Sequence, residues 1–224
     1  MKSVMGSALP IAAAAVMSSV AQGAIVVPGT SNLWLAGMPA GSVAGNGQDT
    51  APAQSPVLAP IAISGGMVLS FSAKGAVNYT PDAPGDWGPD GISGYFSART
   101  PGTENGISDL TARVSSLIGV FLSDDQPDGS EDPNALDFST PGAEDFASLS
   151  PLLKQAFFIG DGFDGQGGVQ SFVVPEGATR LYLGVMDGFG WFNNSGAITV
   201  EVIPAPGALA LAGLASLAAT RRRR

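Results

Sequence analysis

The fold of this chain is restricted most by short segments in which apolar residues alternate with others between turn-forming glycines. In PIAISGGMVLSFSAKGAVNYT, residues 60–80, a Gly65-Gly66 turn is followed by a run with a period of two residues. One side of that run carries Met67, Leu69, Phe71 and Ala73. The other side carries Val68, Ser70 and Ser72. A period of two is typical of a half-buried β-strand.

Further strands are expected along the chain. They are the segments 24–27, 111–121, 170–187, with a turn at 175–177, and 197–202. With 31 Gly and 17 Pro the chain has frequent turns and no helical repeat. These features predict an all-β fold, an antiparallel β-sandwich of the jelly-roll type. The Gly-, Ala-, Pro- and Ser-rich segment 37–60 is expected to be a flexible, exposed connection.

Both ends of the chain have the composition of targeting segments. Lys2 precedes an apolar run and a series of small residues up to Ala24, which is typical of a secretory signal peptide, here 1–23. The other end, 204–224, has a Pro-Ala-Pro motif, a short Ala- and Leu-rich run and four arginines. That run is shorter than the roughly 20 residues that cross a bilayer. The single domain is therefore expected over 24–203.

The C-terminal pattern resembles the PEP-CTERM sorting signal of bacterial envelope proteins, although its motif lacks the glutamate of that family. The resemblance implies a sorting helix, a processing enzyme of the exosortase class as a partner, and a transient or stable membrane anchor. It also implies export to the cell envelope, the cell surface or an extracellular matrix.

The part of the chain between these ends is strongly acidic. The ends hold five of the 10 basic residues and none of the 19 acidic ones, so the remainder has five against 19, a net charge of about −14. Such a surface repels nucleic acid and favours divalent cations. The chain also has no Cys and no His. This excludes Ser-His-Asp and Cys-His catalysis and ordinary zinc sites, and leaves oxygen ligation, which suits calcium.

The segment VMDGFGWFNNSGAITVEV, residues 185–202, holds the strongest candidate site. Between two predicted strands it places Asp187, three aromatic residues and the adjacent pair Asn193 and Asn194. One carboxylate and two amide oxygens match the ligands that calcium prefers. The alternative is a plain turn, because Asp-Gly and Asn-Ser-Gly are also common turn sequences.

This segment resembles the closing segment of the bacterial calcium-dependent galactophilic lectins. A second stretch, AVNYTPDAPGDWGPDGISG at 76–94, is similar to the loop of that family in which a Tyr is followed by Trp-Gly-Pro. The resemblance implies a calcium ion held by Asp187, Asn193, Asn194 and the main-chain oxygens of Tyr79 and of Trp191 or a neighbour. It also implies bound galactose, with Tyr79, Trp87, Asp90, Asp187 and Asn193 as the sugar-binding residues.

The chain departs from the family at two points. The loop from Asp187 to Asn193 is one residue shorter, and the family's His and Gln after Trp-Gly-Pro have no His counterpart here. Trp191, Phe189 and Trp87 are the aromatic side chains that could stack on a sugar ring.

Other acidic clusters have plainer interpretations. The stretch 123–137 carries six acidic residues without EF-hand spacing, and is interpreted as a solvated loop, with a second calcium site as the alternative. The stretch 160–168 is interpreted as a flexible tip.

The sequence as a whole predicts an exported, non-catalytic protein that binds carbohydrate or exopolysaccharide with calcium. One alternative is a structural matrix protein without a ligand. A second is a glycoside-processing enzyme that uses Asp82, Asp86, Asp90 and Asp187 as its carboxylates.

Overall fold

The protein is all-β in the computed structural model, which describes residues 23–83, 85–98 and 102–205. The first of two larger sheets has the strand order β1 (Ile25–Pro28), β14 (Ser195–Pro204), β5 (Val68–Asn78), β12 (Ser171–Val173) and β10 (Ser148–Leu149). The second has the order β11 (Ala156–Phe158), β8 (Leu117–Leu122), β13 (Arg180–Val185) and β4 (Val57–Leu58).

The remaining elements are shorter strands and 3-10 helices outside these two sheets. They are the pair β2 (Val43–Ala44) and β3 (Asp49–Thr50), the three-stranded sheet of β6 (Phe96–Ala98), β7 (Leu110–Arg113) and β9 (Leu136–Asp137), and the 3-10 helices η1 (Leu33–Leu35), η2 (Pro127–Gly129) and η3 (Trp191–Asn193). Among the described residues, no helix has the length and apolar content needed to span a membrane.

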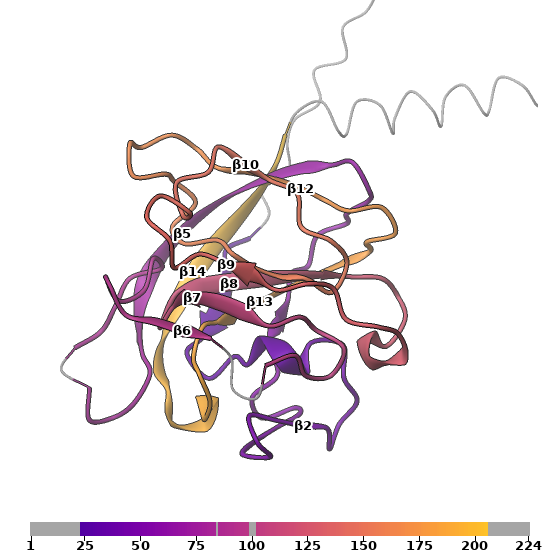
Figure 1. Cartoon of the computed structure of the whole chain (residues 1–224), viewed down its shortest axis with the longest axis vertical. Helices are drawn as coiled ribbons and strands as arrows, with labels where there is room; N and C mark the ends of the chain where they lie inside the picture. Colours follow the sequence, from indigo (N-terminus) through magenta and orange to yellow (C-terminus); the bar gives the residue numbers. More distant parts are fainter. Residues whose placement is uncertain (1–22, 84, 99–101, 206–224) are drawn as a thin grey trace, which may run out of the picture.

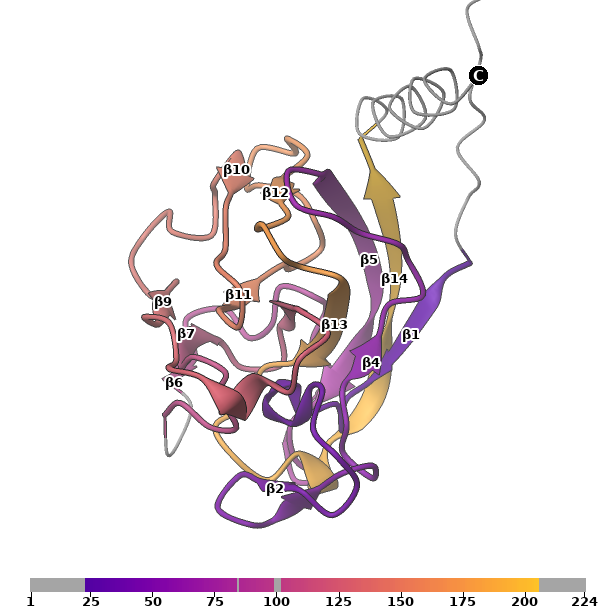
Figure 2. The same ribbon diagram turned by 90° about the vertical axis from the view of Figure 1, so that its right-hand side faces the viewer.

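The predicted β-sandwich is confirmed. Figure 2 shows β5, β14 and β1 as one layer, with β13 and β11 in the layer facing it. Leu69 and Phe71 of β5 are fully buried and belong to one apolar cluster with Leu181 and Leu183 of β13, so the core lies between the sheets. The predicted faces of β5 are also correct, since Ser70 and Ser72 on the opposite side remain partly exposed.

The predicted turns do not form hairpins, because they carry the chain from one sheet to the other. The turn after β12 leads to β13 in the second sheet, and the Gly65-Gly66 turn lies between β4 of the second sheet and β5 of the first. No two neighbours in either larger sheet are consecutive along the chain. A turn motif indicates that the chain reverses its direction. It does not indicate which sheet the next strand joins, because strands of either sheet can pair with it, so the pairing depends on the whole fold. The sandwich also includes a parallel pair, β10 with β12.

The segment 37–60 contains short strands that its composition did not indicate, although most of its residues are exposed or partly exposed, as expected. It contains β2, β3 and β4, and Ala44, Asp49 and Ala51 within it are buried. Several of its glycines have positive φ, such as Gly45 at 61°, so they form tight turns rather than a loose arm.

The predicted signal peptide and sorting segment lie almost wholly outside the described residues, of which they include only 23 and 204–205.

Candidate metal centre

The loop between β13 and β14, residues 186–194, crosses from the second sheet to the first and is not a hairpin turn. It lies at one end of the sandwich, next to the β2 segment, in both Figure 1 and Figure 2. Because packed sheets are about 10 Å apart, the connection must span the core edge. This crossing explains why the segment is longer and richer in side chains than a hairpin needs.

The start of the loop is held on both sides by backbone hydrogen bonds. The Met186 N–H donates to the Ser116 carbonyl (2.8 Å), and the Met186 carbonyl accepts from the Ser115 N–H (2.8 Å). The Met186 side chain is fully buried. These contacts fix the backbone directly before Asp187, which is itself only 7% exposed.

Trp191 anchors the other half of the loop. Its indole Nε1 donates to the Val185 carbonyl (2.7 Å), and its ring lies 5.6 Å from the ring of Trp34. The side chain is fully buried. The expectation that the Trp191 ring could stack on a sugar is therefore wrong, although its main-chain carbonyl, which accepts from the Asn194 N–H (3.1 Å), lies within the loop.

Three of the predicted calcium ligands each present a buried oxygen without a hydrogen-bond partner. These atoms are Oδ2 of Asp187, Oδ1 of Asn193 and Oδ1 of Asn194. An unsatisfied buried polar atom costs about 1–3 kcal/mol, and folded proteins contain few of them. The remaining polar atoms are engaged, since Asp187 Oδ1 accepts from the Gly188 N–H (2.6 Å) and Asn194 Nδ2 donates to the Gly29 carbonyl (3.1 Å). The three free oxygens are the donor set that a cation would satisfy.

The environment of Asp187 disfavours its negative charge in the absence of a cation. Burial raises the pKa of Asp187 from 3.8 to about 6, against the lowering effect of the Asn194 side chain and the Gly188 and Phe189 N–H groups. The charge of Asp49 adds to the increase. A bound cation would reverse this balance, because an opposite charge favours the ionised carboxylate.

The backbone of Tyr79 also reaches this end of the sheet. The antiparallel pairing of β5 with β14 ends at Asn78 opposite Ser195. Tyr79 follows Asn78 directly, so its main chain leaves β5 at the end of the sheet where β14 begins, next to Asn194 in the chain.

Aromatic rings form one rim of the site. Trp87 pairs through its backbone with Val77 of β5 (2.8 and 2.9 Å), and its ring lies 5.6 Å from that of Tyr79. Tyr95, which the sequence analysis did not single out, lies 6.0 Å from Tyr79 and is 49% exposed. Its position in a glycine-rich loop was the only signal for it in the sequence. Phe189 and Phe192 of the loop itself are also exposed.

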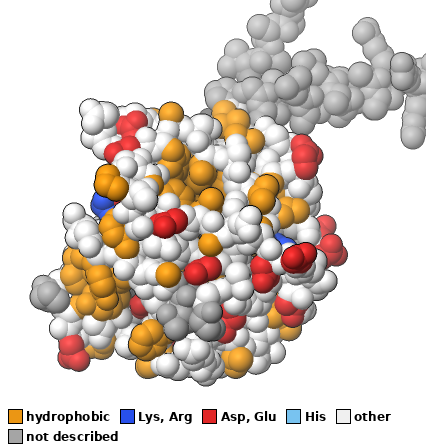
Figure 3. Space-filling model, in the orientation of Figure 1, with side chains coloured by type: hydrophobic (Ala, Val, Ile, Leu, Met, Phe, Trp, Pro, Cys, Tyr) orange, Lys and Arg blue, Asp and Glu red, His pale blue; other side chains and the backbone are white. Residues whose placement is uncertain are grey.

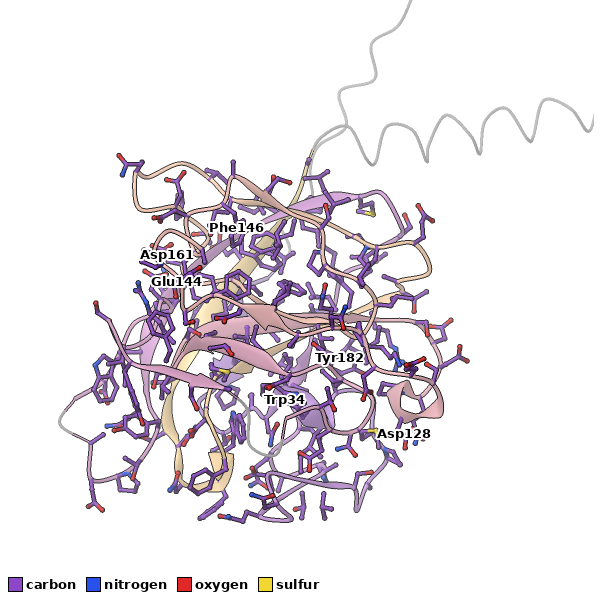
Figure 4. The ribbon with its side chains drawn as sticks, in the orientation of Figure 1. Trp34, Asp128, Glu144, Phe146, Asp161 and Tyr182 are labelled. Carbon is purple, nitrogen blue, oxygen red and sulfur yellow. The ribbon has the colours of Figure 1, made fainter. Side chains whose placement is uncertain are left out.

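The Asp90 side chain is placed in a different cavity. Its Oδ1 accepts from the Asp161 N–H (2.8 Å), and with Arg113, Glu144 and Asp161 it lines a cavity of about 320 Å³ that includes neither Asp187 nor the asparagines. Figure 4 shows Glu144 and Asp161 close together on this side of the molecule. Burial raises the pKa of Asp90 and, despite the ion pair with Arg113 (2.6 Å), raises that of Glu144 to about 7.

The acidic clusters of the sequence do not form carboxylate cages in the described residues, where no group of three or more Asp or Glu side chains could hold a metal. The ammonium group of Lys154 donates to the carbonyls of Ser130 (3.0 Å) and Glu131 (2.6 Å), so the loop 123–137 is held by a protein cation. In the loop 160–168, Asp164 Oδ1 accepts from the Gln166 and Gly168 N–H groups, as in a turn. Asp82 and Asp86 are exposed.

Asp49 is the second residue that sequence reasoning missed. It is fully buried and accepts hydrogen bonds from the Trp191 N–H (3.2 Å) and the Phe192 N–H (2.9 Å). It lies in the segment that was expected to be flexible, and nothing in the sequence connects it to a loop more than 140 residues away.

Comparisons with known proteins find a likeness in structure but none in sequence. No family model and no curated protein matches the chain. Among solved structures, the chain is similar to the EclA N-terminal domain, described as a PllA-like lectin, with a TM-score of 0.35 and 15% sequence identity. The match covers 67% of this chain and 87% of that one. The function proposed below rests on the contacts of the site itself.

Proposed function

We propose that this protein binds carbohydrate without catalysis, and that a calcium ion held by the loop 186–194 is part of the binding site. Asp187, Asn193 and Asn194 would supply side-chain oxygens, and Tyr79 and Trp191 main-chain oxygens. One carboxylate with several neutral oxygens suits calcium better than magnesium, which demands near-ideal octahedral geometry and usually keeps several waters.

One observation carries this proposal. Three buried oxygens without hydrogen-bond partners belong to three residues of one short loop, and one of them belongs to a carboxylate whose pKa burial raises. A plain turn would satisfy these atoms with backbone N–H groups, as the loop 160–168 does. A calcium ion satisfies all three at once and balances the buried charge.

The aromatic rim supports a sugar as the ligand of the loaded site. Calcium can accept hydroxyl groups in its open coordination positions, while Trp87 and Tyr79 offer faces for the apolar side of a sugar ring. A galactose-type sugar remains the proposed class. The Asp90 side chain would not contact a sugar bound at this site, because it lines the neighbouring cavity.

We expect the chelator-stripped full-length protein to bind one calcium ion, with a Kd of about 10⁻⁶ to 10⁻⁴ M and no comparable response to magnesium. Saturation at 100 times Kd should raise the free energy of unfolding by about 2.7 kcal/mol. Calorimetric titration and melting curves with and without chelator measure both effects. An absence of calcium heat, together with melting that chelator does not change, would leave the loop as a structural connection.

We expect Trp87→Ala to weaken galactoside binding by the calcium-loaded protein about tenfold, because a stacking face is lost, while the calcium Kd stays within twofold. Calorimetry with galactose and with an exopolysaccharide compares the variant with the wild type. Phe163→Ala, which removes an exposed ring at the other cavity, is the matched control and should change neither value. Equal losses in both variants would exclude a specific role for Trp87.

The proposed setting is the cell envelope or an extracellular matrix, after export and sorting by an exosortase-type enzyme. Figure 3 shows many acidic and few basic side chains on the face drawn. Such a surface repels nucleic acid, so it supports a partner of another class. The alternative of a structural protein without a ligand makes the opposite prediction in the calcium titration.

A further inference from the structure

The carboxylate of Asp49, on the short strand β3, lies against the loop 186–194, although Asp49 and Trp191 are 142 positions apart in the sequence. Its Oδ2 accepts from Asn32 Nδ2 (3.1 Å) and from the Trp191 N–H (3.2 Å), and its Oδ1 accepts from the Phe192 N–H (2.9 Å). The side chain is fully buried. Three donors from two segments therefore hold this carboxyl group against the loop.

The hydrogen bonds to Asp49 take the place of a side-chain N-cap, which η3 lacks. The residue before η3 is Gly190, whose φ of 81° makes the entry turn but which has no side chain to accept from the first N–H groups of the helix. Asp49 accepts from two of those groups across the tertiary structure. Asn193 and Asn194 follow within η3 and at its end, so the orientation of their side chains depends on how η3 is held.

The arm that carries Asp49 is itself held in place. The Gly45 N–H donates to Glu104 Oε2 (3.0 Å), and Asn105 Nδ2 donates to the Val43 carbonyl (3.0 Å). A methyl group at Gly45 would lie 2.5 Å from Asp49 Oδ2, which shows how closely the turn encloses the carboxylate. The β2 segment lies beside the loop in both ribbon views (Figures 1 and 2).

Two negative charges therefore face the same loop. The Asp49 charge acts repulsively on Asp187, and a divalent cation at the three free oxygens would offset that repulsion.

We propose that Asp49 is the positioning residue of the loop 186–194, and that it aligns the Asn193 and Asn194 oxygens for calcium through its hydrogen bonds with the Trp191 and Phe192 N–H groups. The inference rests on the proposed function. Asp49 would not touch the metal. Residues of this kind typically change metal affinity 10- to 100-fold when they are replaced.

The test is the calcium Kd of full-length Asp49→Asn, measured by calorimetry well below its melting temperature. This change keeps the shape of the side chain but replaces one acceptor oxygen with an NH₂ group. That group cannot accept from the Trp191 or Phe192 N–H, so one of these hydrogen bonds is lost. We expect the Kd to rise at least tenfold. Gly45→Ala, which pushes on the carboxylate and keeps its charge, should raise the Kd about threefold and gives the test a second variant if Asp49→Asn does not fold.

Gln155→Met is the control for stability alone. Gln155 is buried and hydrogen-bonded to Asn134 and Leu152, and it belongs to the connection before β11 rather than to the loop. We expect it to lower the melting temperature without changing the Kd. If the wild type binds calcium and Asp49→Asn binds within twofold of it, the positioning role is overturned while the proposed function stands. If the wild type does not bind calcium, the proposed function fails and the positioning role with it.

Discussion

Replacing Asp187 with asparagine is expected to abolish calcium binding and, at the same time, to stabilise the metal-free protein at pH 7. The only carboxylate among the proposed ligands is lost, so no charged ligand remains to hold the cation. In the metal-free protein the same carboxylate is buried with a pKa raised to about 6, so its ionisation at pH 7 opposes folding. We expect a gain of about 3 kcal/mol in the free energy of unfolding, since the pKa is raised by about two units and each unit corresponds to about 1.4 kcal/mol.

The raised pKa of Asp187 also predicts how the stability of the metal-free protein changes with pH. Between pH 3.8 and about 6 the folded protein keeps a proton on Asp187 that the unfolded chain has released. Its stabilising effect is therefore complete below pH 3.8 and is lost as the pH rises through 6. Glu144, whose pKa is raised from 4.5 to about 7, acts in the same direction up to that pH. Asp187→Asn should flatten the lower part of this decline and leave the part due to Glu144.

Denaturant unfolding with chelator at several pH values from 4 to 7 measures both effects. Glu201→Gln, which neutralises an exposed carboxylate on β14, is the matched control and should keep the calcium Kd and the wild-type pH profile. Retained calcium binding in Asp187→Asn would place the cation elsewhere. A pH profile identical to that of the wild type would show that the buried carboxylate carries no such penalty.

The second large effect is expected in the core, where Phe172→Ala should lower the free energy of unfolding by about 3–5 kcal/mol. Phe172 is fully buried on β12, and its ring lies 4.9 Å from Phe71, 5.5 Å from Phe146 and 5.6 Å from Phe157. Phe71 belongs to the first sheet and Phe157 to the second, so the ring fills the space between the layers. Its removal leaves a cavity that neither sheet can close.

Urea unfolding of the metal-free protein measures this loss, and calorimetry checks that the calcium Kd is unchanged while the variant is folded. Leu152→Ala, at a side chain that is 57% exposed, serves as the control and should cost less than about 0.5 kcal/mol. A loss below 1 kcal/mol in Phe172→Ala would mean that the sheets repack without this ring.

Local patterns predicted the strands better than their partners. The alternation from Met67 to Ala73 placed the buried face of β5 correctly, because one face of a strand at the surface of a core must be apolar. The turns at Gly65-Gly66 and Pro175–Gly177 were also recognised, but not the sheet to which each turn leads. Pairing joins segments as distant as β1 and β14, and it depends on which strands together enclose the core.

The sequence by itself determined the chemistry available to this protein. Without His or Cys, and with Asp187, Asn193 and Asn194 in one short loop, its candidate site offers oxygen ligands, the type that hard cations prefer. Only the tertiary structure decided that these oxygens are buried without partners, that Trp191 is an internal anchor, and that Asp49 holds the loop. The physical reason is that residue types are local, whereas burial and hydrogen-bond satisfaction arise only when distant segments pack together.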